Sequence, residues 1–398
     1  MRFLVLLLVP FMAMATCGPK PPPPDGGGYD CDAQPQHKGL VPVANAIAGR
    51  YIVVLKDRAS TKLIQPLMSA QGVDDVKAIK GGYAARLAAQ ALQRILADPN
   101  VQYVQPETWK YVKPLAGTPT ASWGTDRCDQ RLLPLDGNYD PGATGEGINV
   151  AIVDTGITNH PDYEDRLQTE CFSAHSGGCR DFQGHGSHVA GTVAGVKWGV
   201  AKKAKLWAVR VLDSGGSGSD SDVIRGIDWV REKKLANPSE QWVLNMSLGG
   251  SPAPALDRAT CQAIVAGVVV VAAAGNETDD ARNSSPGRVR QALTVGATEI
   301  FLRQDRQATF SNYGPLLDLY APGVNIESTS NNGTGTNTFS GTSMASPHVA
   351  GGAALYLSRH PGSSAAQVAM GMVEASTKDV VVNPGEGSPN RMLYVKEE

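Results

Sequence analysis

The sequence predicts an α/β protein whose main domain is a parallel β-sheet with helices on both faces. From about residue 123 onward, short apolar runs rich in β-branched residues alternate with longer stretches of helical spacing. Glycine is abundant, with 44 residues, and many glycines stand at the ends of these runs. The alternation is typical of strands joined by helical crossovers, and no internal repeat accompanies it.

Five apolar runs are the predicted strands of this sheet: Ile148–Asp154, Lys205–Leu212, Trp242–Ser247, Val268–Ala273 and Ala292–Ala297. Two stretches between them have helical spacing and are predicted as helices, Asp220–Lys234 and Ala255–Ala266. The carboxyl ends of parallel strands meet at one edge of a sheet. We therefore expect a functional site at that edge.

The chain begins with a targeting segment, predicted as residues 1–16. Arg2 precedes an apolar run from Phe3 to Met14, which suits a signal-peptide core and is too short for a transmembrane helix. Two processing routes remain open. Residues 13–15 (AMA) suit ordinary cleavage, whereas residues 14–17 (MATC) are similar to a bacterial lipobox in which Cys17 would be lipidated. Both routes export the chain.

Two further segments precede the main domain. Residues 17–48 contain the run GPKPPPPDGGG and are predicted as a Pro- and Gly-rich linker, with order beginning near Gly49. Residues 49–113 are predicted as a small α+β unit. Its strands are expected at Tyr51–Leu55, Tyr83–Leu87 and Val101–Val104, and its helix at Ala88–Ala97. On this pattern alone, an ordinary accessory domain is the alternative.

Charge and cysteine content limit the partners and the compartment. The net charge of −2 and the charged fraction of 19% give no basic stripe, so nucleic acid is not an expected partner. Six cysteines in an exported chain indicate disulfides. If Cys17 is lipidated, Cys31 has no obvious partner. The other four allow three connectivities, among which Cys171–Cys179 is the shortest closure.

Asp154 and His185 stand at the ends of predicted elements. Asp154 ends an apolar strand in VAIVDTG, where an ionised carboxylate is costly without a partner. A turn-capping aspartate is the alternative. His185 lies between two glycines in GHGSHVAGT, which leave room for a substrate. His185 and His188 as two metal ligands are the alternative, but no HExxH pattern supports it.

Ser343 stands at the predicted start of a helix in SGTSMASPHVAG. Pro347 is tolerated only near the first turn of a helix, so the backbone N–H of Ser343 should be an unpaired donor beside its hydroxyl. A capping serine is the alternative, although Thr342 or Ser340 could fill that role. A serine hydroxyl becomes a good nucleophile when an imidazole takes its proton and a carboxylate fixes that imidazole.

Three segments resemble the catalytic signatures of the subtilases, family S8: VDTGI, GHGSHVAGT and GTSMASPHVAG, in that order. WGVAKKAKLWAVRVLD and FSNYGPLLDLYAPG are similar to the proteinase K branch and its aqualysin-like bacterial enzymes. The resemblance covers residues 121–396 and implies a subtilisin-like fold with serine endopeptidase activity. It assigns the catalytic roles to Asp154, His185 and Ser343, with Asn276 as the side-chain donor of the oxyanion hole.

The same resemblance implies a substrate cleft for peptides and proteins. Two edges that would pair with an extended substrate are formed by Gly216, Ser217, Gly218, Ser247, Leu248 and Gly249. Ala273, Ala274 and Gly275 would line the S1 pocket, which implies a broad preference for apolar P1 residues. Asp220 stands where proteinase K has an aromatic residue on the S4 rim, which leaves the preference of that pocket open.

Structural calcium is the expected cofactor. One short segment carries the oxygen ligands Asp126, Asp129, Gln130, Asp136 and Asn138, and these positions match a calcium site of aqualysin-like relatives. A solvated loop is the alternative. Asp318 matches the carboxylate of a second site, whose other ligands would be main-chain carbonyls near Arg290 and Ala292.

Residues 49–113 resemble an inhibitor I9-type, ferredoxin-like propeptide through GRYIVVLKD, GGYAARL and VQYVQPE. The resemblance implies an intramolecular inhibitor whose tail lies in the cleft, with self-cleavage between Val112 and Ser122. An anchor on Cys17 would then tether the precursor and not the mature enzyme, which is expected to be a monomer. A catalytically silent binding protein would need a broken triad or oxyanion group, and the sequence shows neither. A protein that acts by releasing residues 50–113 is the third alternative.

Overall fold

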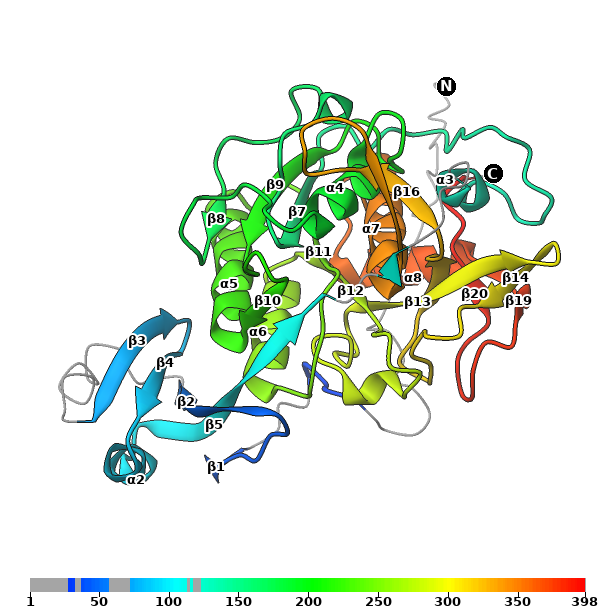
Figure 1. Ribbon diagram of the computed structural model, residues 1–398. Helices are drawn as coiled ribbons and strands as arrows, with labels where there is room; N and C mark the ends of the chain where they lie inside the picture. The colour runs from blue at the N-terminus through cyan, green and yellow to red at the C-terminus, as the bar shows by residue number, and fades with distance from the viewer. Residues whose placement is uncertain (1–27, 33–36, 57–71, 113–114, 117–122, 398) are drawn as a thin grey trace, which may run out of the picture.

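The computed structural model describes residues 28–32, 37–56, 72–112, 115–116 and 123–397 (Figure 1). The predicted signal peptide, Cys17 and the proline run lie outside the described residues. Two parts are distinguished below: an N-terminal unit, residues 37–112, and a main domain, residues 123–397. No helix in the described ranges is long and apolar enough to cross a membrane.

The main domain is built on a central parallel sheet in the strand order β15-β13-β12-β11-β7-β9-β8. In chain order these strands are β7 Asn149–Asp154, β8 Phe172–Ser173, β9 Lys205–Arg210, β11 Trp242–Met246, β12 Val269–Ala273, β13 Leu293–Phe301 and β15 Leu319–Pro322. The predicted strands are therefore present close to their expected bounds, and β13 runs beyond its expected end.

The complete sheet is mixed, whereas the sequence predicts a parallel one. Strand β14 (Gln304–Gln307) returns antiparallel to β13 through a tight hairpin in which Leu302 and Arg303 have φ of 49° and 63°. Positive φ at both central residues matches the twist of paired strands. Three short strands complete this end of the sheet, β18 Thr377–Lys378, β19 Val381–Val382 and β20 Arg391–Met392, and β18 is antiparallel to β20.

Helices cover both faces of the central sheet, as expected (Figure 1). Along β7, Val150 and Ile152 face one core and Ala151 and Val153 face the other, because successive strand residues point to opposite sides. The first core contains α4 (His185–Ala194), α7 (Thr342–Arg359) and α8 (Ala365–Ala375). The second contains α5 (Asp220–Ala236) and α6 (Pro254–Val265). The short helix α3 spans Gly124–Cys128.

The N-terminal unit is a mixed sheet, in which β1 is parallel to β5 and the other neighbouring strands are antiparallel, and its described residues include the helix α2 (Ala89–Ala97). Its strand order is β1-β5-β2-β4-β3, and α2 packs on it through Leu92 and Ile95. The strands are β1 Gly39–Leu40, β2 Ala46–Leu55, β3 Val73–Ile79, β4 Gly82–Leu87 and β5 Val101–Tyr111. The charged strand β3 is absent from the sequence prediction. Order also begins before Gly49, because β1 and the start of β2 pair with β5.

Strand β5 leaves the N-terminal unit and enters the main domain, where it pairs antiparallel with β10 (Ser217–Ser219) (Figure 1). The chain is described again at β6 (Leu115–Ala116), which pairs with β17 (Thr336–Ser340), itself paired with β16 (Ile326–Thr329). The predicted strand Val101–Val104 is therefore only the first part of a longer one. Its extension depends on pairing with a distant segment, which local pattern does not reveal.

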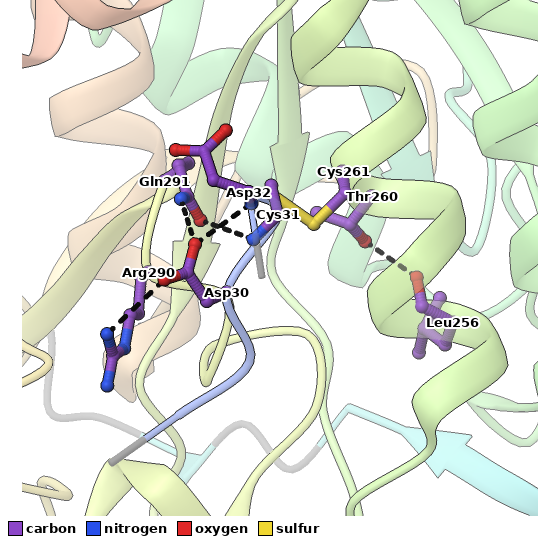
Figure 2. The surroundings of a disulfide bond; sticks show 8 residues. All are labelled: Asp30, Cys31, Asp32, Leu256, Thr260, Cys261, Arg290 and Gln291. Atoms are coloured by element: carbon purple, nitrogen blue, oxygen red, sulfur yellow. Dashed lines mark hydrogen bonds and ion pairs between the residues drawn. A yellow bond between two sulfur atoms is a disulfide. The ribbon is translucent and has the colours of Figure 1, made fainter. Parts of the chain in front are cut away.

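Among the five cysteines that the structure describes, two disulfides are formed, Cys31–Cys261 and Cys171–Cys179, and Cys128 is free and buried. The short closure Cys171–Cys179 agrees with the sequence. The expectation that Cys31 lacks a partner is wrong, because it reaches α6 across a separation of 230 residues (Figure 2). Burial raises the pKa of the Cys128 thiol above its usual range, which keeps that thiol protonated and unreactive.

Candidate active site

Asp154 and His185 form a buried pair at the carboxyl edge of the sheet. Asp154 is the last residue of β7, and both of its carboxylate oxygens lie 2.9 Å from His185 Nδ1. Both side chains have 0% exposure. A carboxylate accepts a hydrogen bond, so Nδ1 carries the proton and Nε2 of the neutral ring has a free lone pair. Nε2 has no hydrogen-bond partner among the described residues.

Asp181 fixes the loop that leads into α4, and the sequence prediction misses it. Its carboxylate accepts hydrogen bonds from the backbone N–H groups of Gln183, Gly184 and Ser187 at 2.8–2.9 Å, and from the hydroxyl of Ser187 at 2.8 Å. It thereby satisfies unpaired donors at the start of the helix that begins with His185. In the sequence, the signal for this role is an aspartate three residues before Gly184, close ahead of the predicted start of the helix.

His188 is a core residue and does not pair with His185 as a metal ligand. Its Nε2 lies 2.9 Å from the carbonyl oxygen of Ile326, and its ring packs on Phe339 with centroids 4.7 Å apart. Burial lowers the pKa of His188 to about 3, so the ring stays neutral. The two histidine rings therefore face different partners, the Asp154 carboxylate and a main-chain carbonyl.

Ser343 lies in the first turn of α7, next to Ser247 at the end of β11. Pro347 lies further inside the helix than the sequence predicts. It has no N–H to donate to the Ser343 carbonyl one turn earlier. The Ser247 hydroxyl donates to that carbonyl instead, at 2.8 Å. In return the Ser343 hydroxyl donates to the carbonyl of Ser247 at 2.9 Å, so it is not bonded to His185 in this structure.

Asn276 is held beside the start of α7 by Thr342. The backbone N–H and the hydroxyl of Thr342 both donate to Asn276 Oδ1, at 2.8 and 2.9 Å. The carbonyl end of the side chain is therefore fixed, which leaves the amide nitrogen Nδ2 as the free end. Gly275 precedes it with φ of 107°, and a Cβ there would lie 2.3 Å from Asn312. Only glycine fits this position without strain.

One pocket brings Ser343 and Asn276 together. Its lining residues are Tyr111, Leu248, Gly249, Ala273, Gly275, Asn276, Glu277, Ser284, Thr342 and Ser343. Ala273 and Gly275 agree with the predicted S1 walls, but Ala274 does not line the pocket. Its side chain points to the opposite side and packs with Leu316 and Leu317, because successive residues along an extended chain face opposite ways.

Glu277 is a lining residue that the sequence prediction misses. Its carboxylate accepts hydrogen bonds from the Asn276 backbone N–H at 2.8 Å and from Asn312 Nδ2 at 3.0 Å. These bonds tie the carboxylate to the loop that carries Asn276. Only its place directly after Asn276 could have drawn attention to it in the sequence.

Both predicted substrate edges bind a segment of the chain itself. The backbone N–H and carbonyl of Tyr111 pair with Gly249 at 3.2 and 3.3 Å, and the Val112 N–H donates to the Gly216 carbonyl at 3.1 Å. Ser217 and Gly218 pair with Tyr111 and Lys110 in an antiparallel register. Residues 109–112 thus lie as an added strand between the two edges.

The predicted calcium segment contains two carboxylates that have hydrogen-bond partners at only one of their two oxygens. Asp126 and Asp129 each accept one backbone N–H, from Gly137 and Asp140, yet the Oδ1 atom of each is buried without a hydrogen-bond partner. Burial, and then the negative charge of Asp136, raise the pKa of both carboxyl groups. Deprotonated carboxylates in this position would gain most from a cation.

The remaining predicted ligands of this segment shape its turn. Gln130 Oε1 accepts the N–H of Asp136 at 3.2 Å, and Asp136 Oδ1 accepts the N–H of Asn138 at 2.9 Å. Across the described residues, no three Asp, Glu, His or Cys side chains come together as a metal-binding group. A cation here would therefore need amide or main-chain oxygens as well.

Asp318, the carboxylate of the second predicted site, is buried with 1% exposure at the start of β15. Its Oδ2 accepts the backbone N–H of Thr294 at 2.9 Å. Arg290, whose neighbourhood was expected to supply carbonyl ligands, donates its backbone N–H to Tyr29.

Comparison with known proteins identifies the class to which this fold and site belong. The Subtilase family model matches residues 145–392. The chain belongs to this family and is a serine endopeptidase.

Individual relatives agree with this classification. The chain is 43% identical to an extracellular serine proteinase of Thermus sp. (strain Rt41A), over 98% of each protein. It is 40% identical to alkaline serine exoprotease A of Vibrio alginolyticus, over 91% of this chain and 70% of that protein.

Solved structures agree with the fold. A cold adapted subtilisin-like serine proteinase superposes with a TM-score of 0.66 at 43% identity, over 70% of this chain and 99% of that one. Fervidolysin from Fervidobacterium pennivorans superposes with a TM-score of 0.75 over 95% of this chain and 64% of that one. At 22% identity, fervidolysin supports the fold alone.

Proposed function

We propose that this chain is an exported endopeptidase that cleaves peptide bonds with Ser343 as nucleophile, His185 as general base and Asp154 as its orienting carboxylate. Two observations carry this proposal together: the buried Asp154–His185 pair at the carboxyl end of β7, and the pocket lined by Ser343 and Asn276 at edges that bind an added strand of the chain itself.

The geometry supports acyl transfer through these residues. Rotation of the Ser343 side chain away from the Ser247 carbonyl would bring its hydroxyl to His185 Nε2, which takes the proton while Oγ attacks the substrate carbonyl. The Ser343 N–H and Asn276 Nδ2 would donate to the oxyanion. His185 then returns the proton to the leaving amine. Water hydrolyses the acyl-enzyme with the same base and restores the serine.

Residues 49–113 would act as an intramolecular inhibitor, because β5 occupies the cleft as a substrate would. Val112 pairs with one side of the active site, at Gly216, and Leu115 pairs with Ser340 on the other side. We therefore narrow the self-cleavage site to the peptide bonds between Val112 and Leu115. A broad apolar P1 preference is supported by Leu248, Ala273 and Gly275 in the lining of the pocket.

Calcium would stabilise the folded enzyme at the segment that contains Asp126 and Asp129. Their unpaired buried oxygens fit a hard cation, with Gln130, Asp136 and Asn138 as further oxygen donors on the same turn. Asp318 is the proposed carboxylate of a second site.

Export is supported by the extracellular Thermus relative and by the predicted signal peptide. The mature enzyme is proposed to be a monomer.

A serine-directed fluorophosphonate tests this function. Folded, processed enzyme should be labelled at Ser343, and Ser343→Ala should be unlabelled and accumulate as an uncut precursor. Ser358→Ala is a matched control, since Ser358 lies in the same helix and bonds only to the carbonyl of Leu355. Processed wild type that resists labelling at Ser343 would instead support a catalytically silent binding protein.

A further inference from the structure

A lysine of the added strand is completely buried in the cleft. Lys110 has 0% exposure, and its backbone pairs with Gly218 on one edge of the cleft. Lysine is almost never fully buried without a partner, because removing its ammonium group from water is costly. The surroundings of Lys110 must therefore supply charge and hydrogen-bond acceptors.

Asp220 of the main domain supplies the opposite charge. Lys110 Nζ lies 2.8 Å from Asp220 Oδ1, and both side chains have 0% exposure. The same ammonium group donates to Thr108 Oγ1 at 2.8 Å and to the carbonyl of Ser251 at 3.0 Å. The ammonium group therefore has two hydrogen-bond acceptors and an ion-pair partner at close range, and Asp220 Oδ1 itself accepts no hydrogen bond in this arrangement.

The backbone of the main domain leaves space for this side chain. A Cβ on Gly250 would lie 2.8 Å from the carbonyl of Trp109 and 3.1 Å from Cδ of Lys110. A second carboxylate, Asp257, lies within the electrostatic reach of Lys110. Burial raises the pKa of Asp257 to about 7, and the positive charges of Arg288 and Lys110 act against that rise.

Asp220 remains in the main domain when the N-terminal unit leaves. It also accepts hydrogen bonds from the backbone N–H and hydroxyl of Thr108, both at 2.8 Å, which would be lost at that point. A substrate that fills the cleft as β5 does would bury this carboxylate again. A buried carboxylate without a cation is strongly destabilising. The cost is avoided when the substrate carries a cation there.

The part of the cleft that holds the Lys110 side chain is here called the Lys110 subsite. We propose that Asp220 makes the Lys110 subsite selective for a substrate with lysine or arginine at the position that Lys110 occupies. This inference rests on the proposed function and deepens it, since it gives the enzyme a second determinant away from the S1 pocket. The subsite would exclude acidic residues at that position and disfavour apolar ones.

Synthetic peptides of residues 105–118 test the selectivity. Four versions carry Lys, Arg, Leu or Glu at position 110, and kcat/KM is measured for cleavage at the same bond. Wild type should cleave the Lys and Arg peptides at least about tenfold faster than the Leu peptide, which corresponds to about 1.4 kcal/mol. The Glu peptide should be slowest. Equal rates for Lys and Leu would overturn the proposal.

Variants of the enzyme extend the test. Asp220→Leu should reverse the order of the Lys and Leu peptides, because an ammonium group would then be buried against an apolar wall. Glu232→Gln removes an exposed carboxylate from the same helix, α5, and should leave the order unchanged. If wild type cleaves none of the four peptides, the result contradicts the proposed endopeptidase function. Equal cleavage of the Lys and Leu peptides contradicts the selectivity alone. If Asp220→Leu is not produced folded, the wild-type series still decides.

A separate observation concerns the segment upstream of the N-terminal unit. Residues 28–32 lie against the main domain, where the backbone of Tyr29 pairs with the backbone of Arg288 and Arg290 at 2.9 and 3.0 Å. Figure 2 shows the contacts of the next two residues, Asp30 and Cys31. Gln291 donates to Asp30 at 2.7 Å and accepts the N–H of Cys31 at 3.1 Å. Cys31 is then bonded to Cys261 of α6.

This disulfide spans the proposed self-cleavage site, since Cys31 precedes it and Cys261 follows it. We infer that the catalytic fragment keeps a Cys31-containing peptide after a single cut between Val112 and Leu115. The N-terminal unit would stay at high local concentration beside the cleft, until a second cut separates it. On this inference a lipid on Cys17 would also remain connected after the cut, whereas the sequence alone led to the expectation that the anchor is lost on processing.

Intact mass measured with and without a reductant tests this inference on processed wild type, stopped with a serine-directed inhibitor. Reduction should release a peptide that contains Cys31. A non-reduced mass equal to the catalytic fragment alone would overturn the inference. A single uncut chain in both states would mean that self-cleavage itself fails. Cys31→Ser should abolish the attachment, whereas the pair Cys171→Ser and Cys179→Ser should leave it intact.

Discussion

At the scale of single residues, the hydrogen-bond partner decides what a side chain can do. His185 and His188 lie one turn apart in α4. One faces a carboxylate and keeps Nε2 free, whereas the other faces a main-chain carbonyl and is held neutral by burial. The sequence singles out His185 by its flanking glycines, but it does not show which group each ring faces. Their different surroundings are determined by β7 and β16, which are distant in the chain.

Asn276 gives a prediction at this scale. Asn276→Leu removes the free amide donor, and we expect kcat to fall by about 10²–10³ with little change in KM, because the lost bond forms only in the transition state. Steady-state kinetics on a neutral peptide substrate would measure both constants. An unchanged kcat would show that Nδ2 does not contact the oxyanion.

At the scale of elements, a glycine allows helix α4 to pack closely against the end of a strand. A Cβ on Gly186 would lie 2.1 Å from the carbonyl of Gly156 and 3.2 Å from Cβ of Asp154. The helix therefore approaches the end of β7 closely, and this approach brings His185 within hydrogen-bond distance of Asp154. The flanking glycine expected to leave room for substrate instead makes room for the backbone.

Gly186→Ala should consequently shift the helix and lengthen the Asp154–His185 bond. We expect activity to fall by at least about tenfold and stability to fall by roughly 1–3 kcal/mol from overpacking. The stability change should be measured in a Ser343→Ala background to prevent self-digestion. Gly215→Ala is the control, because its nearest neighbour is a carboxylate oxygen at 3.2 Å and the backbone is not crowded.

The loop with Asp126 and Asp129 gives a prediction about metal removal. Chelation should shorten the lifetime of the mature enzyme at elevated temperature, since an ion bound only by the folded state stabilises it by mass action. The pKa of both carboxyl groups is raised, so protons compete with calcium and the protection should weaken as pH falls.

Asp126→Asn should reduce the effect of added calcium, and Asp140→Asn at the exposed end of the same segment should reduce it less. Residual activity after heating, with and without calcium, gives the measurement. Equal lifetimes of wild type in calcium and in chelator would argue for the solvated-loop alternative.

At the scale of the whole molecule, three separate stretches of chain hold the N-terminal region against the main domain. They are the disulfide-bonded segment 28–32, strand β3 through the ion pair of Lys77 with Asp222 of α5, and strand β5 in the cleft. One of these contacts, Lys77 with Asp222 at 2.9 Å, is partly exposed and therefore contributes little. The disulfide and the buried strand carry most of the attachment.

The two disulfides should differ in their effect on the uncut precursor. The comparison is made in the Ser343→Ala background. The Cys31–Cys261 disulfide closes a loop with a sequence separation of 230, whereas Cys171–Cys179 closes one with a separation of only 8. The chain-entropy relation gives losses in the free energy of unfolding of about 5.5 and about 2.5 kcal/mol. The double-serine variant that lacks Cys31–Cys261 should therefore have a lower calorimetric midpoint than the variant that lacks Cys171–Cys179. The reverse order would mean that local strain outweighs chain entropy.

The sequence by itself determined the sheet-and-helix order and the identity of Asp154, His185, Asn276 and Ser343 as the candidate site, because periodicity and contiguous motifs are local properties. Tertiary structure decided the rest. The extension of β5, the burial of Lys110 against Asp220 and the bond from Cys31 to Cys261 each join segments far apart in the chain. Such contacts depend on how the folded backbone brings distant residues together, and no local pattern records them.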